Sequence, residues 1–257
     1  MSSLTLNIRF NGGITPSQEL IFQESAQRWS QIITEDLPLV KIDNEQIKGI
    51  VIDASAHPID GKSGILGQAG PTRFRPDSGL PAKGIMRFDS ADLDQLEDNN
   101  QLSNTIMHEI AHVIGFGTLW QKKGLIRGIG SANPSFTGVK ACAEMATLLG
   151  FQASVTVPVA NTGGRGTRDG HWREHLLGHE LMTGFLNEGN NPISRLTIAS
   201  FDDLGYKVDY SQADDYNLPS HQELAMMGIF ADNGSKSHCA MCGIHSKKYE
   251  RDELNYA

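Results

Sequence analysis

One apolar segment of this chain carries three polar side chains that a hydrophobic core does not accept without partners. Residues 100–114 show hydrophobic positions at helical spacing, and Gly115 follows where such a helix would end. The three polar side chains are His108, Glu109 and His112. Their neighbours along the chain are apolar, so we expect the helix to be buried, where an unpaired polar group is costly. The segment therefore predicts a buried helix whose histidines bind a partner, and a metal ion meets that need.

The spacing of the two histidines suits one ion. His108 and His112 are four residues apart, so both imidazoles lie on one helix face and can reach a zinc ion at about 2.0–2.1 Å. Glu109 lies about 100° further round the helix, beside the ion but not bound to it. There it could take a proton from a metal-activated water and pass it to a leaving amine. The same five-residue pattern also arises by chance on surface helices, and the apolar flanks are what favour the metal site.

A catalytic zinc site needs a third protein ligand. In the short metzincin pattern a third histidine follows six residues after the second, and here that position is Thr118. Glu144 could serve, although a lone glutamate on a weakly polar helix is more often solvated surface. Three downstream histidines are spaced by four and could line one helical face. The residues alone leave these candidates open: Glu144, His171, His175, His179 and Glu180.

Two blocks of the sequence resemble the leishmanolysin-like metallopeptidases, a branch of the metzincins. The first block is HEIAHVIGFG, residues 108–117, and the second is HWREHLLGHELMTG, residues 171–184. In the second block Met182 follows His171 by 11 positions, as in the family pattern of a third histidine and a methionine turn. The run SRLTIASFDDLGY, residues 194–206, resembles the helix that follows in this family.

The resemblance implies a role for each residue at a matching position. It implies zinc ligands at His108, His112 and His171, a catalytic base at Glu109, and an apolar floor beneath the metal at Met182. It leaves His175 and His179 outside the ligand set. The run GIMRFDSADL, residues 84–93, resembles the metzincin edge strand that pairs with an extended substrate, which would involve Gly84, Ile85 and Met86.

The expected fold class is α+β, of the metzincin-like zinc peptidase type. We expect an N-terminal lobe, residues 1–118, with a twisted sheet and helices that include the active-site helix. A C-terminal irregular and helical lobe, residues 119–212, would hold the third ligand and the methionine turn across a cleft. Residues 213–257 would form an extension with a short helix and a tail that contains cysteine and histidine.

Local patterns predict the individual elements. A capping box at Thr15 and Gln18, with Pro16 at the first helical position, predicts the start of a helix. Alternation of apolar and polar residues predicts a first strand from Leu4 to Phe10. Further strands are expected near 49–52, 65–68 and 84–88, and further helices near 140–149, 191–204 and 224–230.

A second constellation lies near the C-terminus. Its four potential ligands, His238, Cys239, Cys242 and His245, could hold a second, structural zinc ion. Structural zinc sites usually draw ligands from two separated pairs, so four ligands within eight residues would strain the chain. The alternatives are a mobile tail with free thiols and a Cys239–Cys242 disulfide. Lone Cys142 is expected to be a small buried apolar residue.

Composition limits the remaining classes. The formal net charge is −8, which disfavours nucleic-acid binding. No apolar run approaches the roughly 20 residues that span a bilayer, and the first residues lack the features of a signal peptide. Three cysteines are not a disulfide framework, so the default expectation is a cytoplasmic protein, although family members are often secreted. The many disulfides, the propeptide and the lipid anchor of eukaryotic members are not expected here, and the short bacterial-type members are the closer likeness.

These observations predict a zinc-dependent metalloendopeptidase that hydrolyses peptide bonds of protein or peptide substrates. The alternative is a catalytically silent zinc-binding or adhesion module of the same fold. A glutamate beside the metal that does not bind it favours the enzyme, since a structural zinc site has no use for such a group. The sequence leaves the substrate, the cleavage preference, the activation and the oligomeric state open.

Overall fold

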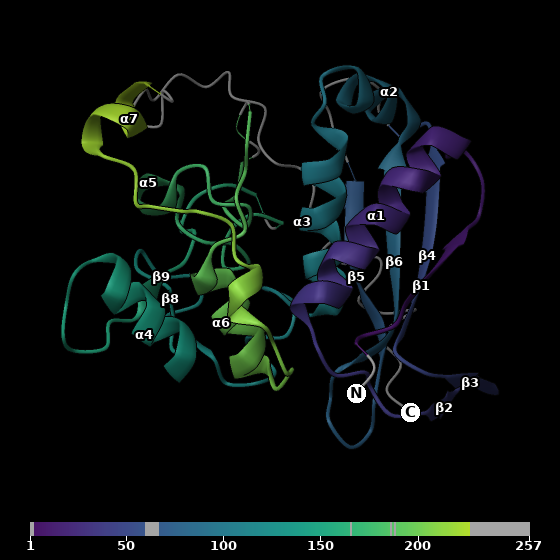
Figure 1. The fold of residues 1–257 in the computed structure, drawn as a ribbon, viewed down its shortest axis with the longest axis horizontal. Helices are drawn as coiled ribbons and strands as arrows, with labels where there is room; N and C mark the ends of the chain where they lie inside the picture. Colours follow the sequence, from purple (N-terminus) through teal and green to yellow (C-terminus); the bar gives the residue numbers. More distant parts are fainter. Residues whose placement is uncertain (1–2, 60–66, 165, 186, 188, 227–257) are drawn as a thin grey trace.

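The N-terminal part of the chain is built on a four-stranded sheet (Figure 1). The computed structural model describes residues 3–59, 67–164, 166–185, 187 and 189–226. Strand order in the sheet is β1-β4-β6-β5, with β5 antiparallel to β6 and the other pairs parallel. The strands are β1 (Leu6–Phe10), β4 (Ile50–His57), β5 (Gly67–Phe74) and β6 (Pro81–Asp89).

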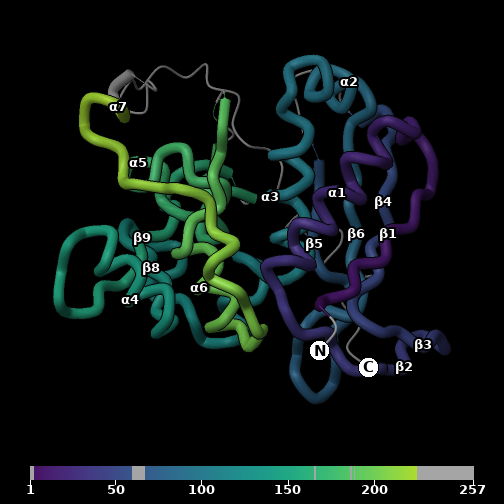
Figure 2. Tube along the Cα trace, in the orientation of Figure 1, coloured from purple at the N-terminus to yellow at the C-terminus, as the bar shows by residue number. Residues whose placement is uncertain are grey.

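Two helices cover one face of this sheet. Helix α1 (Pro16–Ile32) begins with the predicted capping box, in which Thr15 and Gln18 satisfy each other's backbone N–H groups. Helix α3 (Leu102–Ile114) ends at Gly115, whose positive φ of 126° suits a residue without a side chain. In Figures 1 and 2, α3 lies between the sheet on the right and the C-terminal elements on the left.

Paired positions on β4 and β6 show which side of the sheet is apolar. Ala54 lies opposite Met86 and Ala56 lies opposite Phe88, and these four side chains are buried in the core beneath the helices. Alternate residues point to the other face and are mainly polar or charged. The sheet therefore presents one face to α1 and to α3, the helix that carries His108 and His112, and one face to solvent.

The predicted substrate edge strand is wrong in position. Gly84, Ile85 and Met86 lie in β6, which pairs with β4 on one side and with β5 on the other, so both its hydrogen-bonding edges are occupied. The end of the run assigned to that strand is helical, since α2 (Ser90–Asp98) begins directly after β6. The antiparallel strand at the edge of the sheet is β5.

The C-terminal part contains short elements joined by irregular segments. A three-stranded sheet, β7-β8-β9, forms within a stretch expected to be irregular, and a β2–β3 hairpin adds to the N-terminal part. Helix α6 begins later than expected, because Ser194 rather than Asn191 caps it. The remaining elements are β2 (Val40–Ile42), β3 (Glu45–Ile47), β7 (Ile126–Arg127), β8 (Ser135–Phe136), α4 (Val139–Leu148), β9 (Val157–Pro158), α5 (Glu174–Leu177), α6 (Arg195–Leu204), the 3-10 helix η1 (Tyr210–Gln212) and α7 (His221–Met226).

The expected α+β class is confirmed, with a mixed sheet, helices on one face and a helical C-terminal part. Cys142 is buried on α4 with a free thiol, as expected. The second predicted zinc site, His238, Cys239, Cys242 and His245, lies outside the described residues. Among the helices that are described, none combines the length and the apolar character needed to cross a membrane.

Candidate metal centre

Helix α3 is enclosed by the rest of the protein. Every residue from Thr105 to Ile114 is buried. Trp29 of α1 donates its indole N–H to the carbonyl of Met107 at 2.9 Å, and Tyr206 donates its hydroxyl to the carbonyl of Ile114 at 2.8 Å. The first bond fixes α3 to α1, and the second satisfies a carbonyl at the helix end that has no partner within the helix. The polar side chains of α3 are therefore held in place from both parts of the chain.

Three imidazoles from two distant segments meet in the interior. His108 Nε2 lies 2.9 Å from His112 Nε2 and 3.0 Å from His171 Nε2, and His112 Nε2 lies 3.1 Å from His171 Nε2. All three residues are buried, with at most 2% of their surface exposed. They are the group of potential metal ligands that the described part of the chain brings together.

The other ring nitrogen of each histidine faces a backbone carbonyl. His108 Nδ1 bonds Leu181 at 2.7 Å, His112 Nδ1 bonds Phe116 at 2.9 Å, and His171 Nδ1 bonds Thr167 at 2.9 Å. A carbonyl oxygen only accepts, so each Nδ1 carries a proton and donates it. In a neutral imidazole the Nε2 atom then presents a lone pair, which is the form that binds a metal.

Burial keeps the rings of His108 and His171 neutral. It lowers the pKa of His108 to about 4, and it lowers the pKa of His171 to about 3, with the nearby His108 adding to the shift. Three neutral rings with lone pairs at about 3 Å repel one another, and a cation between them reverses the sign of that interaction. Nitrogen ligands at about 2.1 Å in a tetrahedral zinc site are about 3.4 Å apart, a few tenths of an ångström more than the 2.9–3.1 Å between the Nε2 atoms here. The residues present therefore fit a zinc ion.

Within the described part of the chain, the carboxylate of Glu109 has no hydrogen-bond partner. The side chain is fully buried, and neither carboxylate oxygen has a hydrogen-bond partner among the residues that the structure describes. Burial raises the pKa of Glu109 well above its usual value. A buried carboxylate without donors is costly, so its presence in a native structure needs a reason, and a catalytic role or a neighbouring ion is one. A cation at the adjacent histidines would lower this pKa, because it favours the charged form.

Close backbone contact brings the third histidine to α3. Gly117 follows the helix with a φ of 69°, and a side chain there would overlap the carbonyl oxygen of Gly170. Two glycines in contact therefore place His171 next to the end of α3. Trp172 then packs its ring against Phe116, with centroids 4.9 Å apart, within a cluster of buried aromatic side chains. The ligand from the irregular segment is thus held by tertiary packing rather than by a helix.

The predicted methionine turn lies beside this histidine. The carbonyl of Met182 accepts a hydrogen bond from the backbone N–H of Trp172 at 3.0 Å, and Met182 is fully buried. The carbonyl of the preceding residue, Leu181, holds His108. The turn is therefore tied to ligand candidates from both parts of the chain.

The other candidates for the third ligand lie outside the cluster. Glu144 is on α4 and forms an ion pair with Arg195 at 2.9 Å. His175 is exposed on α5, and the ring of His179 lies beside Tyr216, with centroids 5.7 Å apart. The possible helical row of His171, His175 and His179 does not form, because α5 spans only Glu174–Leu177.

Sequence reasoning missed the groups that orient the cluster. The carbonyls of Leu181, Phe116 and Thr167 belong to the backbone and carry no residue-type signal. Glu180 was considered only as a metal ligand, whereas its side chain accepts four hydrogen bonds within the C-terminal part. Recognition of Ser194 as a helix cap would have pointed to this interaction, since the Ser194 hydroxyl contacts Glu180.

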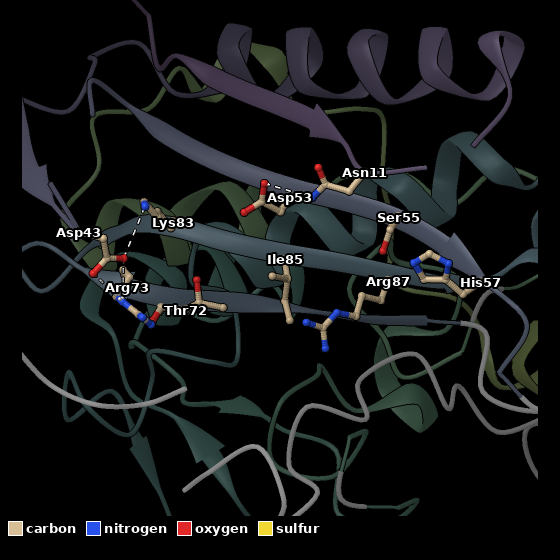
Figure 3. Close-up of a pocket in the computed structure, with 10 residues that line it drawn as sticks. All are labelled: Asn11, Asp43, Asp53, Ser55, His57, Thr72, Arg73, Lys83, Ile85 and Arg87. Atoms are coloured by element: carbon tan, nitrogen blue, oxygen red, sulfur yellow. Dashed lines mark hydrogen bonds and ion pairs between the residues drawn. The ribbon is translucent and has the colours of Figure 1, made fainter. Parts of the chain in front are cut away.

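A polar pocket of about 500 Å³, lined in part by His57, lies on the solvent-facing side of the sheet (Figure 3). Its charged groups largely offset one another. Asp43 pairs with both Arg73 and Lys83, and Asp53 accepts a hydrogen bond from Asn11. The three-histidine cluster, on the opposite side of the sheet, instead adjoins Glu109, whose carboxylate oxygens have no hydrogen-bond partner among the described residues.

The fold and the cluster can be compared with known proteins. A family model for leishmanolysin matches residues 48–223, well over half of the chain. The matched range contains all of α3 and the segment from His171 to Met182. No curated protein shows a significant match to the chain.

Proposed function

The chain belongs to the leishmanolysin family of metallopeptidases, and on that premise we propose that it is a zinc-dependent endopeptidase that uses His108, His112 and His171 to hold the ion. The single observation that carries the proposal is the convergence of three buried imidazole Nε2 atoms, each with its Nδ1 proton committed to a carbonyl. Neutral imidazoles suit zinc, and three of them with one open position are the arrangement of a catalytic rather than a structural site.

Glu109 is the proposed general base. A zinc ion supplies Lewis acidity when bound, since it polarises a substrate carbonyl and makes water more acidic. Glu109 accepts the proton of the attacking water and delivers it to the leaving nitrogen. Its position next to His108, and the absence of any partner for its oxygens in the described residues, leave the carboxylate available for both transfers.

Helix α3 and the turn at residues 180–182 fix the positions of the proposed ligand side chains. The Nδ1–H bonds fix the orientation and the tautomer of each ring, so that every Nε2 lone pair points at one position. We assign Met182 to the apolar floor of the site because it is buried and hydrogen-bonded through its carbonyl to the residue after His171. We also propose that residues 1–118 and 119–212 form two lobes. The first lobe supplies His108 and His112, and the second supplies His171.

Strand β5 is the proposed docking edge for an extended substrate. It is one of the two outer strands of the sheet, the one that packs against α3, which carries Glu109. Pro71 lies within it, and proline within a sheet is tolerated mainly on edge strands. Main-chain pairing with such an edge binds peptides without strong demands on side chains, which suits cleavage of protein substrates.

Peptide cleavage by the purified protein tests the function. We expect cleavage inside a denatured protein substrate, loss of cleavage with a chelator and recovery on addition of zinc. Glu109→Ala should retain zinc and lose activity by about 10²–10⁴-fold, the usual contribution of a general base. Glu24→Ala, which removes an exposed glutamate from α1, is the matched control and should remain active. A zinc-loaded wild type that cleaves nothing would instead support the silent module.

Zinc affinity tests the ligand assignment. His171→Ala should weaken zinc binding far more than His175→Ala, because only the first ring points into the cluster. Equal losses would contradict the assignment. The zinc content of the wild type also tests the C-terminal constellation, since one equivalent per chain argues against a second ion and two equivalents support it.

A further inference from the structure

Glu180 is a second fully buried glutamate, and four groups donate hydrogen bonds to it. Its Oε2 atom accepts from the backbone N–H of Met182 at 2.6 Å. Its Oε1 atom accepts from the hydroxyls of Ser194 and Thr197, both at 2.6 Å, and from the backbone N–H of Ser194 at 3.1 Å. No cation pairs with Glu180 in the part of the chain that the structure describes.

The surrounding groups favour the carboxylate form of this side chain. Thr197 Oγ1 already accepts from the indole N–H of Trp172, and Ser194 Oγ accepts from the backbone N–H of Thr197, so both hydroxyl protons are left to point at Glu180. Backbone N–H groups cannot accept a proton in a hydrogen bond. O–H···O distances of 2.6 Å are in the range of bonds to an ionised oxygen. Burial raises the pKa of Glu180, and the four donors act against that shift.

One peptide group connects this carboxylate to the metal cluster. The N–H that Glu180 accepts belongs to Met182, and the carbonyl of the same peptide group belongs to Leu181. That carbonyl accepts the Nδ1 proton of His108 at 2.7 Å. A continuous chain therefore runs from the carboxylate through one planar amide to the imidazole.

The Nδ1 bonds of the other two histidines lead to different peptide groups. His171 Nδ1 bonds the carbonyl of Thr167, and the N–H of that peptide group, which belongs to Arg168, donates to the carbonyl of Gly164. His112 Nδ1 bonds the carbonyl of Phe116, and no carboxylate is recorded on that peptide group in the residues described. His108 is thus the histidine whose Nδ1 bond leads, through one peptide group, to a buried carboxyl group.

We propose that Glu180 is a positioning residue that strengthens zinc binding by His108 through the Leu181–Met182 peptide group. The inference rests on the proposed function, because it requires that His108 holds the ion. A carboxylate on the N–H end of an amide polarises its carbonyl, and hydrogen bonds in such a chain strengthen one another. The more polarised carbonyl accepts the Nδ1 proton more strongly and raises the basicity of Nε2.

Glu180→Gln isolates this effect from simple loss of packing. The amide oxygen can still face the Ser194 and Thr197 donors, but the amide NH₂ then faces the Met182 N–H and cannot accept from it. We expect the apparent Kd for zinc, measured by competition with a chromophoric chelator, to rise about 10–100-fold, as for other groups that orient metal ligands. The Co²⁺-substituted variant should also show a changed visible spectrum, which a purely structural role would leave as in the wild type.

Asp89→Asn is the matched control. Asp89 is equally buried and accepts backbone N–H bonds from Ala91 and Ile59, but these bonds cap α2 and hold the segment after β4 rather than the turn at residues 180–182. This variant loses a buried charge without touching the proposed chain of bonds, so its zinc affinity should equal that of the wild type. Equal affinity in Glu180→Gln and the wild type would overturn the proposed role of Glu180 and leave the proposed function intact. A wild type that binds no zinc would overturn both.

If Glu180→Gln does not fold, NMR of the wild-type protein tests the role of Glu180 instead. In zinc-loaded ¹⁵N-labelled protein, the Met182 amide proton should resonate far downfield and exchange slowly, because it donates a short bond to an ionised oxygen. Zinc removal should move this resonance, since the same peptide group contacts His108. An ordinary chemical shift that is insensitive to zinc would overturn the proposal.

Discussion

Helix α3 and the turn at residues 180–182 each bury a glutamate completely, and they treat it in opposite ways. Glu180 accepts four hydrogen bonds, whereas neither oxygen of Glu109 has a partner in the structure as described. Both side chains are 0% exposed, so burial alone does not separate them. The satisfied carboxylate holds its surroundings in place, and the unsatisfied one keeps its capacity for a reaction.

The two regions also differ in how they place an imidazole. On α3, one helical turn sets the spacing of His108 and His112, and the buried face of the helix fixes both. His171 lies in an irregular segment and depends on glycine contact and aromatic packing. The same ligand geometry therefore arises from a local repeat in one region and from long-range contacts in the other.

Removal of the satisfied carboxylate should have the largest effect. Glu180→Met leaves four buried donors without an acceptor, and each such loss costs about 1–3 kcal/mol. We expect the free energy of unfolding of the metal-free protein, measured in urea, to fall by at least about 3 kcal/mol. A loss below about 1 kcal/mol would show that the four donors find other partners, which would remove the contrast between the two glutamates.

Disruption of the glycine contact that places His171 should have the second largest effect on stability. Gly117→Ala forces a side chain into a left-handed backbone and into the Gly170 carbonyl, so we expect a loss of about 2–3 kcal/mol together with weaker zinc binding. Gly124→Ala is the control, since its φ of 68° is similar but nothing lies within 4 Å of the added carbon. Equal zinc affinities in the two variants would mean that the contact with Gly170 does not position the third histidine.

Removal of the unsatisfied carboxylate of Glu109 should raise the free energy of unfolding rather than lower it. Glu109→Met replaces a buried carboxyl group without partners by an apolar side chain of similar length, and we expect the metal-free protein to gain about 1–2 kcal/mol of stability. Urea unfolding without metal, compared with Glu180→Met under the same conditions, measures the difference directly. Destabilisation by Glu109→Met would show that the carboxylate has a structural partner and that the two glutamates are alike.

Loss of the N-cap of α1, a local contact, should have the smallest effect on stability. Thr15→Ala removes the N-cap of α1, whose hydroxyl accepts from the Gln18 N–H, and loss of such a cap costs about 1 kcal/mol. Thermal unfolding should show this small decrease, and the apparent Kd for zinc should not change. A weaker affinity for zinc would indicate that the cap of α1 and the metal cluster are coupled through α3.

The helices and the first two ligand candidates were predictable from the sequence because their signals are local. The capping box at Thr15, the glycine at the end of α3 and the spacing of His108 and His112 each involve residues within one or two turns. His171 and Met182 were assigned by family resemblance, since nothing in residues 171–184 alone separates one histidine from the other two. The family match over residues 48–223 includes this block, and the Nε2 distances place His171 in the cluster.

Strand order was beyond the reach of local patterns. The alternation in β6 shows which side chains face the helices, but it carries no information about neighbours along the hydrogen-bonding direction, so the central strand was mistaken for an edge. The same limit applies to the backbone carbonyls that hold the imidazoles and to the donors around Glu180. The sequence by itself determined that two histidines and a glutamate would share one buried helix, because helical periodicity is a property of neighbouring residues. Only the tertiary structure decided which of the two buried glutamates is satisfied, because hydrogen-bond partners far apart in the chain meet only when it folds.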